Sequence, residues 1–116
     1  MVLEETTEQG ILERLNDAQE REAIFLFTPM CGTCQIGEKM LEVVQATGKG
    51  IPLLKLNINY APHLREKWQI ESVPAVVIIQ GGVLLYKQYA MHGVDVLYEL
   101  LRRDKLYGVL GPLDNS

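Results

Sequence analysis

The sequence predicts a single α/β domain over residues 1–116, with a central mixed β-sheet and helices on both of its faces. Three observations carry this prediction. Apolar runs of strand length alternate with stretches of helical periodicity, a pattern typical of parallel strands joined through helices. A Gly81-Gly82 pair between two late apolar runs is typical of a hairpin, which adds an antiparallel edge. The 116 residues can bury one core but are too few for two domains.

The first quarter of the chain predicts a helix followed by a buried strand. A short strand around residues 2–5 opens the domain. Thr6 or Thr7 can cap a helix that extends to about residue 18. The continuous apolar run at 23–27 then predicts a strand that is covered on both faces, as in a parallel sheet.

A second helix is expected after Thr28 and Pro29, which end that strand. It should start near Cys31 and end in the glycine-rich stretch at 47–50. Its buried stripe is predicted from four apolar residues at helical spacing, namely Ile36, Met40, Val43 and Val44.

The rest of the chain predicts three strands and two helices. In order, they are a strand at 52–58, a short helix at 62–68, strands at 75–79 and 83–86, and a helix at about 94–105. The buried stripe of the last helix is predicted to contain Val94, Leu97, Tyr98 and Leu101. We expect the tail, about residues 107–116, to be loosely ordered.

Composition and charge exclude several classes of protein. Hydrophobic residues make up 47% of the chain and charged residues 22%, which excludes a disordered or fibrous protein. Two cysteines are too few for a disulfide scaffold. The net charge of −4 argues against nucleic acid and against an anionic membrane as partners. The chain shows neither a signal peptide nor an apolar run of the roughly 20 residues that span a bilayer, so we expect a cytoplasmic protein.

The segment Cys31-Gly32-Thr33-Cys34 is the motif with the clearest chemistry. It falls where an apolar strand passes into a helix. A helix N-terminus presents unpaired N–H groups and the positive end of the helix dipole, and both favour a thiolate over a thiol. We therefore predict that Cys31 is the activated sulfur and that Cys34, one turn further on and shielded, resolves it through a disulfide.

Two other interpretations of this cysteine pair stay open. The pair could be half of a zinc site, but zinc needs three or four protein ligands, and only His63 and His92 remain as isolated partners. The pair could also be two unreactive buried cysteines, although the small, polar-tolerant residues between them argue against this. A redox dithiol is favoured, because C-x-x-C beside a strand–helix–strand pattern is typical of one in a cytosolic protein.

Four features of the chain occur together, in order, in one known family. They are the strand-to-helix C-x-x-C, the strand Lys55-Leu56-Asn57-Ile58-Asn59, the segment Trp68-Gln69-Ile70-Glu71-Ser72-Val73-Pro74, and the Gly81-Gly82 hairpin. The strand is close to a K-x-N-x-D pattern, and the segment is similar to a Y-x-I-x-S-V-P pattern that ends in a cis-proline. With these features the chain resembles the thioredoxin superfamily over about residues 12–101.

The resemblance implies a thioredoxin-like fold and a thiol–disulfide oxidoreductase. Cys31 would attack a disulfide in a protein substrate, and Cys34 would release the product. A reductase or a small thiol would supply the electrons, with no bound cofactor and no metal. The resemblance also implies that Pro74 is cis and faces the cysteines, so that Val73 can pair with a substrate strand. The candidate substrate-binding residues are Met30, Gly32, Thr33, Val73 and Pro74.

The chain departs from the family's pattern around the cysteines. Met30 and Thr33 replace the Trp and the Pro of W-C-G-P-C. Thr28 and Pro29 are similar to the Y-T-x-P-x-C of glutaredoxins, yet the glutathione-binding marks of that family after the proline strand are absent.

Phe25 stands where the family carries a buried carboxylate, six residues before the first cysteine. Lys55 stands where that carboxylate has its lysine neighbour, so Lys55 is a candidate electrostatic modulator. Desolvation raises the pKa of a shielded thiol such as that of Cys34, and residues 23–27 offer no acid to take its proton. We therefore expect the release of a mixed disulfide to be slow relative to attack and to quicken with rising pH.

Two rival functions remain at this point. One is a glutaredoxin-like reductase that depends on glutathione or another small thiol. The other is a binding module, in which the fold carries a metal or an iron–sulfur cluster or docks to a partner. Two cysteines cannot complete a four-cysteine cluster, so a cluster would need a dimer or external thiols.

Overall fold

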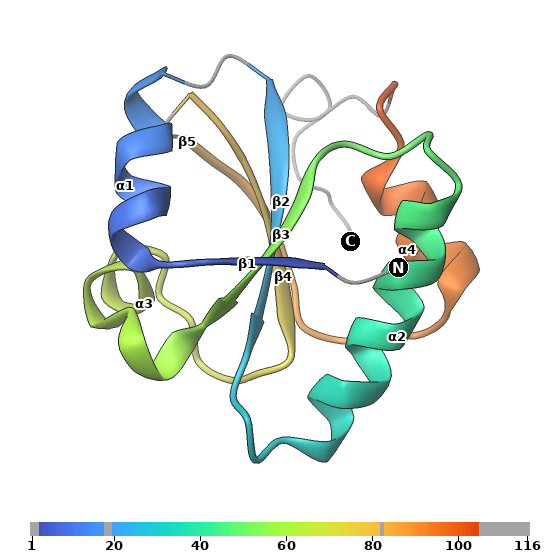
Figure 1. The fold of residues 1–116 in the computed structure, drawn as a ribbon, viewed down its shortest axis with the longest axis horizontal. Coiled ribbons are helices and arrows are strands. Elements are labelled where there is room, and N and C mark those ends of the chain that lie inside the picture. Colours follow the sequence, from blue (N-terminus) through green and yellow to red (C-terminus); the bar gives the residue numbers. More distant parts are fainter. Residues whose placement is uncertain (1–2, 18–19, 82, 105–116) are drawn as a thin grey trace.

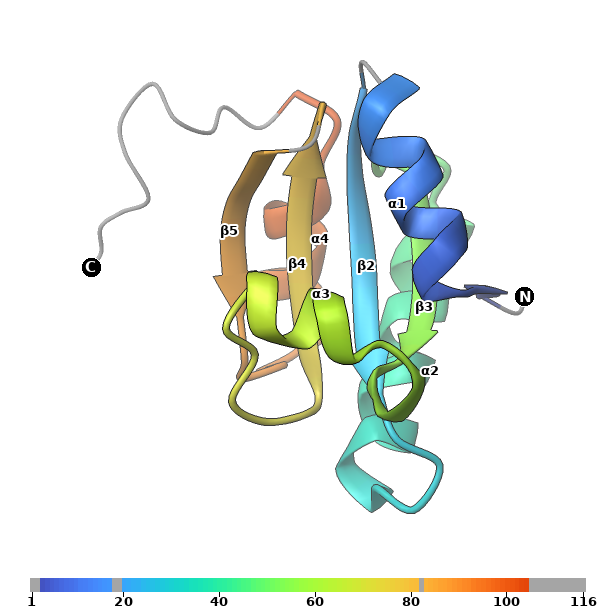
Figure 2. The same cartoon turned by 90° about the vertical axis from the view of Figure 1, so that its left-hand side faces the viewer.

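A computed structural model describes residues 3–17, 20–81 and 83–104, in which helices cover both faces of a mixed sheet (Figures 1 and 2). In chain order the elements are β1 (Glu4–Thr6), α1 (Glu8–Asp17), β2 (Arg21–Phe27), α2 (Gly32–Ala46), β3 (Leu53–Asn57), the 3₁₀ turn η1 (Ile58–Tyr60), α3 (Pro62–Lys67), β4 (Ala75–Gln80), β5 (Val83–Gln88) and α4 (Val94–Leu101). The predicted fold class is confirmed. The tail expected to be loosely ordered lies outside the described residues. No helix among those described is long and apolar enough to cross a membrane.

The sheet has the strand order β1-β3-β2-β4-β5. β1, β3 and β2 run parallel, whereas β4 and β5 run antiparallel to their neighbours. β2 is the central strand; residues 23–26 of the predicted apolar run are buried and Phe27 is partly buried. The first strand was expected around residues 2–5 and is observed at Glu4–Thr6.

Side chains alternate between the two faces of the sheet, and each face has its own core. Ala23 and Phe25 of β2 pack in one core with α2 and α4, whereas Ile24 and Leu26 pack in the other, on the side of α1 and α3. Figure 1 shows this division, with α1 and α3 on one side of the sheet and α2 and α4 on the other.

Side-chain hydrogen bonds cap the ends of α1 and α3, and one of these bonds links the two helices. Thr7 caps α1, because its Oγ1 accepts a hydrogen bond of 3.0 Å from the Gly10 N–H. The N-cap position of α3 has no side-chain cap of its own, and the Glu8 carboxylate of α1 instead accepts the Leu64 N–H at 2.7 Å. At the other end of α3, Lys87 Nζ donates to the carbonyl oxygens of Trp68 and Gln69, both at 3.1 Å.

The buried face of α2 differs from the predicted stripe. Ile36 and Val43 are 60% and 53% exposed, so the prediction was wrong for both, and Met40 is only partly buried. The buried residues of this helix are Cys34, Gly37, Leu41 and Val44. Gly37 explains the shift, because a Cβ there would lie 3.0 Å from Met91 Cγ and 3.5 Å from Phe25 Cε1. The glycine brings its own side of the helix against the sheet.

The last helix is shorter than predicted, and its buried residues are Leu97, Leu100 and Leu101. Val94 and Tyr98 of the predicted stripe are only half-buried. α4 ends at Leu101, where the backbone of the chain pairs with the loop after α2. The Ile51 N–H donates to the Leu101 carbonyl at 2.9 Å, and Arg102 forms a bridge with Gly50.

The observed orientation of α2 predicts unequal effects for two truncations in that helix. Leu41 is fully buried, so Leu41→Ala should lower the free energy of unfolding by about 2–5 kcal/mol. Val43→Ala is the matched control, and it should change stability by less than about 0.5 kcal/mol because the Val43 side chain is half in solvent. Urea denaturation of both variants measures this difference. Equal losses would contradict the orientation of the helix.

Candidate functional site

Cys31 and Cys34 lie at the turn from the central strand into α2. Cys31 is the N-cap residue of the helix, with extended backbone angles (φ −99°, ψ 108°). Its sulfur accepts a hydrogen bond of 3.1 Å from the Cys34 N–H. The two sulfurs are joined in a disulfide, with the Cα atoms 5.2 Å apart. The expected start of the helix near Cys31 is therefore confirmed.

The two cysteines differ in their access to solvent. Cys34 is only 2% exposed and belongs to the core under α2, whereas Cys31 is half-buried and packs against the edge of that core. Gly32 and Thr33 between them are exposed, and Thr33 Oγ1 lies 3.4 Å from the Cys31 sulfur. The Cys34 N–H points at the accessible sulfur from the first helical turn, and the helix N-terminus favours negative charge on Cys31.

The segment before β4 reaches the same end of the sheet. Because Ala75 pairs with Leu26, Pro74 lies beside the end of β2, just before the turn that carries the cysteines. The Val73–Pro74 peptide bond is cis. Val73 packs against the core that contains Cys34, as Cys31 does. Figures 1 and 2 both show the loop before β4 and the turn into α2 at one end of the molecule.

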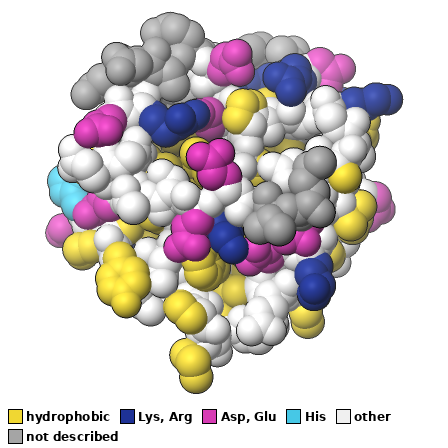
Figure 3. Space-filling model, viewed as in Figure 1, with side chains coloured by type: hydrophobic (Ala, Val, Ile, Leu, Met, Phe, Trp, Pro, Cys, Tyr) yellow, Lys and Arg dark blue, Asp and Glu magenta, His cyan; other side chains and the backbone are white. Residues whose placement is uncertain are grey.

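Exposed apolar side chains gather at this end of the molecule. Figure 3 shows hydrophobic side chains there, around the turn from β2 into α2. We define the apolar rim as Met30, Ile36 and Tyr60, which are 94%, 60% and 79% exposed. A small cavity of about 130 Å³ opens nearby, with Thr28, Ser72 and Val73 among its lining residues. The predicted substrate-binding residues thus lie near the cysteines, on separate segments of the chain.

Lys55 pairs with an acid that the sequence analysis did not single out. Its Nζ lies 2.7 Å from Glu38 Oε2 and 5.4 Å from the centre of the Phe27 ring. Phe25 is fully buried and stacks on Phe27, with ring centroids 6.2 Å apart. Glu38 follows Cys34 by four residues on α2, a helical spacing that could have revealed it in the sequence.

The two histidines that were considered as metal ligands lie on separate segments of the chain. His63 and His92 are both exposed, on α3 and in the loop before α4. Over the ranges 3–17, 20–81 and 83–104, no group of three or more His, Cys, Asp or Glu residues could hold a metal ion.

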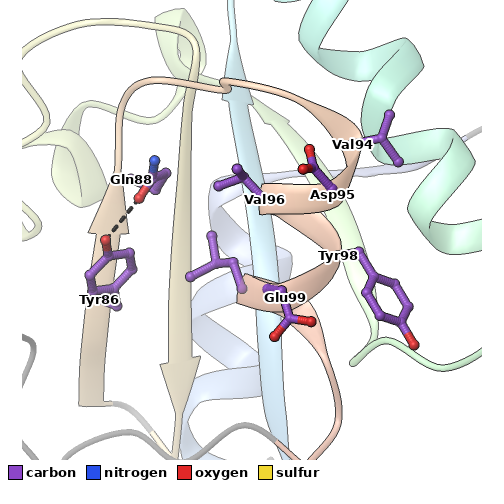
Figure 4. A pocket seen from close by; sticks show the side chains of 8 residues that line it. Tyr86, Gln88, Val94, Asp95, Val96, Tyr98 and Glu99 are labelled. Carbon is purple, nitrogen blue, oxygen red and sulfur yellow. Dashed lines mark hydrogen bonds between the residues drawn. The ribbon is translucent and has the colours of Figure 1, made fainter.

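A larger groove of about 780 Å³ lies between β5 and α4 (Figure 4). Tyr86 and Gln88 line it from the strand and are hydrogen-bonded to each other at 2.8 Å, and Asp95 and Glu99 are among the α4 residues that line it. None of its lining residues belongs to the cysteine site, so the groove is a separate feature of the surface.

Comparisons with known proteins agree on one family. The family model described as Thioredoxin matches residues 2–102. Thioredoxin-like protein YusE of Bacillus subtilis is 41% identical over 80 residues, which are 69% of this chain and 76% of that protein. A thioredoxin of Mycoplasmoides gallisepticum is 24% identical over 96 residues, which are 83% of this chain and 96% of that protein.

Solved structures share the fold. A mutant thioredoxin from Halobacterium salinarum matches with a TM-score of 0.76 at 17% identity, over 90% of this chain and 94% of that one. Chloroplastic thioredoxin z matches with a TM-score of 0.72 at 18% identity, over 86% and 91% of the two chains. The match of the family model to residues 2–102, together with the fold and the close cysteine pair, shows that this chain belongs to the thioredoxin family.

Proposed function

We propose that the protein is a thiol–disulfide oxidoreductase that reduces disulfides in protein substrates. The observation that carries this proposal is the unequal cysteine pair at the start of α2. Cys31 is accessible and caps the helix, whereas Cys34 is buried one turn away and already bonded to it. Such a pair can exchange a disulfide with a partner, because one sulfur is open to attack and the other is held within reach.

The reaction proceeds in two exchanges that conserve electrons. In the reduced protein, the Cys31 thiolate attacks one sulfur of a substrate disulfide, and the other substrate sulfur leaves as a thiolate. The Cys34 thiolate then attacks Cys31, so that the mixed disulfide breaks and the second substrate sulfur leaves. The substrate gains two electrons and two protons, and the protein is left with its Cys31–Cys34 disulfide. A reductase or a small thiol would return the protein to the dithiol form.

The residues around Cys31 would recognise the substrate. Met30 and the other side chains of the apolar rim offer an exposed apolar surface for a partner chain. Gly32 lies in open space beside the sulfur, where a Cβ would meet no atom within 4 Å. Val73 and Pro74 would flank the bound segment from the opposite side. The cytoplasmic setting stays a prediction from the sequence.

Experiments on the purified protein would distinguish the two rival functions from this proposal. A glutaredoxin-like reductase would be recycled by glutathione directly, and a cluster carrier would be coloured on purification. The cysteine geometry does not favour either rival over disulfide exchange with proteins.

Reduction of insulin disulfides tests the proposed function directly. The protein should accelerate the reduction of insulin by dithiothreitol, which is followed as turbidity from the precipitating chain. Cys31→Ser should abolish the acceleration, because the attacking sulfur is lost. Equal turbidity rates with the parent protein, with Cys31→Ser and with no protein would contradict an exchange function.

The exposure of the two sulfurs predicts which one an alkylating reagent modifies. When reduced protein meets limiting iodoacetamide near neutral pH, the label should fall on Cys31, because Cys34 is buried. Peptide mapping by mass spectrometry locates the label. Preferential labelling of Cys34 would reverse the two roles.

Trapping of substrates should also separate the two cysteines. Cys34→Ser keeps the attacking sulfur and loses the resolving one, so it should accumulate mixed disulfides with protein substrates. Cys31→Ser is the matched control and should accumulate far fewer. Non-reducing gels of both variants after exposure to a disulfide-containing protein give the comparison, and similar trapping by both would count against the scheme.

A further inference from the structure

We propose that the small cavity beside the cysteine turn is a subsite for an acidic side chain of the protein substrate, and that Arg65 binds the carboxylate of that side chain. This inference rests on the proposed function, because the subsite would bind the segment that carries the substrate disulfide. It goes beyond that function by naming a class of substrate, in which Asp or Glu stands close to the cysteine that Cys31 attacks.

The cavity is built from segments that are far apart in the sequence. Its polar lining residues are Thr28 after β2, Asn59 of η1, Arg65 of α3 and Ser72 of the loop before β4. Ile70 and Val73 are among its apolar lining residues. Figure 2 shows α3 and the loop before β4 at the end of β2 that leads to the cysteine turn. The fold therefore gathers these polar groups beside the candidate site.

The size of the cavity indicates a single side chain rather than a whole ligand. Its volume is about 130 Å³. Sites that enclose a whole small molecule have volumes of roughly 300–1,000 Å³, whereas a cavity of roughly 150 Å³ holds one benzene molecule. The side chain of Asp or Glu contains fewer heavy atoms than benzene. The cavity thus fits one side chain of a longer chain.

Arg65 is the arginine that the described part of the protein leaves without a side-chain partner. The four other arginines use their guanidinium groups in ion pairs or in hydrogen bonds to backbone carbonyls. Over the ranges 3–17, 20–81 and 83–104, Arg65 forms neither contact, although Glu66 and Glu71 are close in sequence. A guanidinium presents its donors in a planar fork that matches a carboxylate. Arg65 is therefore available for a carboxylate from another chain.

The other polar groups of the lining can complete the recognition of a carboxylate. Thr28 and Ser72 each carry a hydroxyl group and Asn59 carries an amide, and all three can donate hydrogen bonds to carboxylate oxygens. Ile70 and Val73 offer apolar contact to the CH₂ groups of the entering side chain. None of the described lining residues is acidic, so a carboxylate would meet no negative charge in the lining.

The cavity lies within reach of a substrate segment that is bound at Cys31. Thr28 and Cys31 are the ends of a tight turn, in which the Cys31 N–H donates to the Thr28 carbonyl at 3.3 Å. The Cα atoms at the ends of such a turn are less than about 7 Å apart. An extended segment advances about 3.3 Å per residue. The acidic residue should therefore lie about two positions from the substrate cysteine.

Reduction of matched model peptides tests this subsite. Each substrate is a symmetric disulfide of two identical peptides, in which Glu, Gln or Lys stands two positions before or two positions after the cysteine. The reduced protein is mixed with each substrate, and the single-turnover rate of disulfide loss is measured. At one of the two positions, the Glu peptide should react about 5-fold faster than the Gln peptide, which is the upper range for an ion pair at a protein surface. The Lys peptide should react most slowly at that position.

Variants of α3 assign the preference to Arg65. Arg65→Gln should bring the ratio of the Glu and Gln rates to about one, because the cation is lost. Arg65→Glu should reverse the order, so that the Lys peptide reacts faster than the Glu peptide. Lys67→Gln is the matched control, since it removes a positive charge from the same helix outside the lining of the cavity, and it should leave the ratio unchanged. Each ratio compares two peptides on one variant, so a loss of stability would not imitate the effect.

The outcomes separate this inference from the proposed function. If the parent protein reduces none of the peptides, the proposed function fails and the subsite fails with it. If it reduces the Glu and Gln peptides at equal rates at both positions, the subsite alone is overturned. A preference that Arg65→Gln and Lys67→Gln diminish equally would come from the overall charge of the helix, and it would also overturn the subsite.

Oxidised glutathione distinguishes the two sources of a carboxylate. Its carboxylates belong to a small thiol rather than to a protein side chain. In the parent protein and in Arg65→Gln, its rate of reduction is measured beside the rates for the Glu and Gln peptides. The proposal predicts that Arg65→Gln changes the preference between the peptides. A variant that slows the reduction of oxidised glutathione and leaves the peptide preference intact would exclude the protein side chain as the ligand.

Discussion

The hydrogen bond from the Cys34 N–H to the Cys31 sulfur joins the local structure of this protein to its chemistry. It makes a cysteine the N-cap of α2, so the start of the helix and the position of the reactive sulfur are one feature. The bond depends in turn on how α2 lies on the sheet. Gly37 leaves room for the Met91 side chain against the helix, and Leu41 anchors the next turn in the core. One sulfur is thereby buried and the other left at the surface.

The core beneath α2 combines an apolar layer on the central strand with a charged pair at its border. On the central strand, Phe25 stacks on Phe27 and makes an apolar layer. The acid beside this layer is on α2, where Glu38 forms an ion pair with Lys55. Burying a carboxylate without partners is costly, and a pair at the border of the core avoids most of that cost. The charge is thus kept on α2, while residues 23–27 of the central strand are all apolar.

Most of the fold could be predicted from the sequence, because the central strand, the cysteine turn and the hairpin have strong local signals. The orientation of α2 could not, since apolar periodicity selected Ile36 and Val43. The helix in fact packs through Cys34 and Gly37. Their small size favours close packing only against the side chains that face them, which the sequence of the helix alone does not show. Glu38 was missed for a related reason. Its spacing from Cys34 is visible in the sequence, but its contact with Lys55, 17 positions away on another element, is not.

The redox equilibrium of the cysteine pair against glutathione tests the central claim that Cys31 and Cys34 act as one dithiol. The protein is equilibrated over a range of ratios of reduced to oxidised glutathione, and its thiols are trapped by acid and counted by mass. The account predicts one two-electron transition between dithiol and Cys31–Cys34 disulfide, with a midpoint between about −270 and −120 mV. Two cysteines that form separate adducts with glutathione, and no intramolecular disulfide at any ratio, would contradict it.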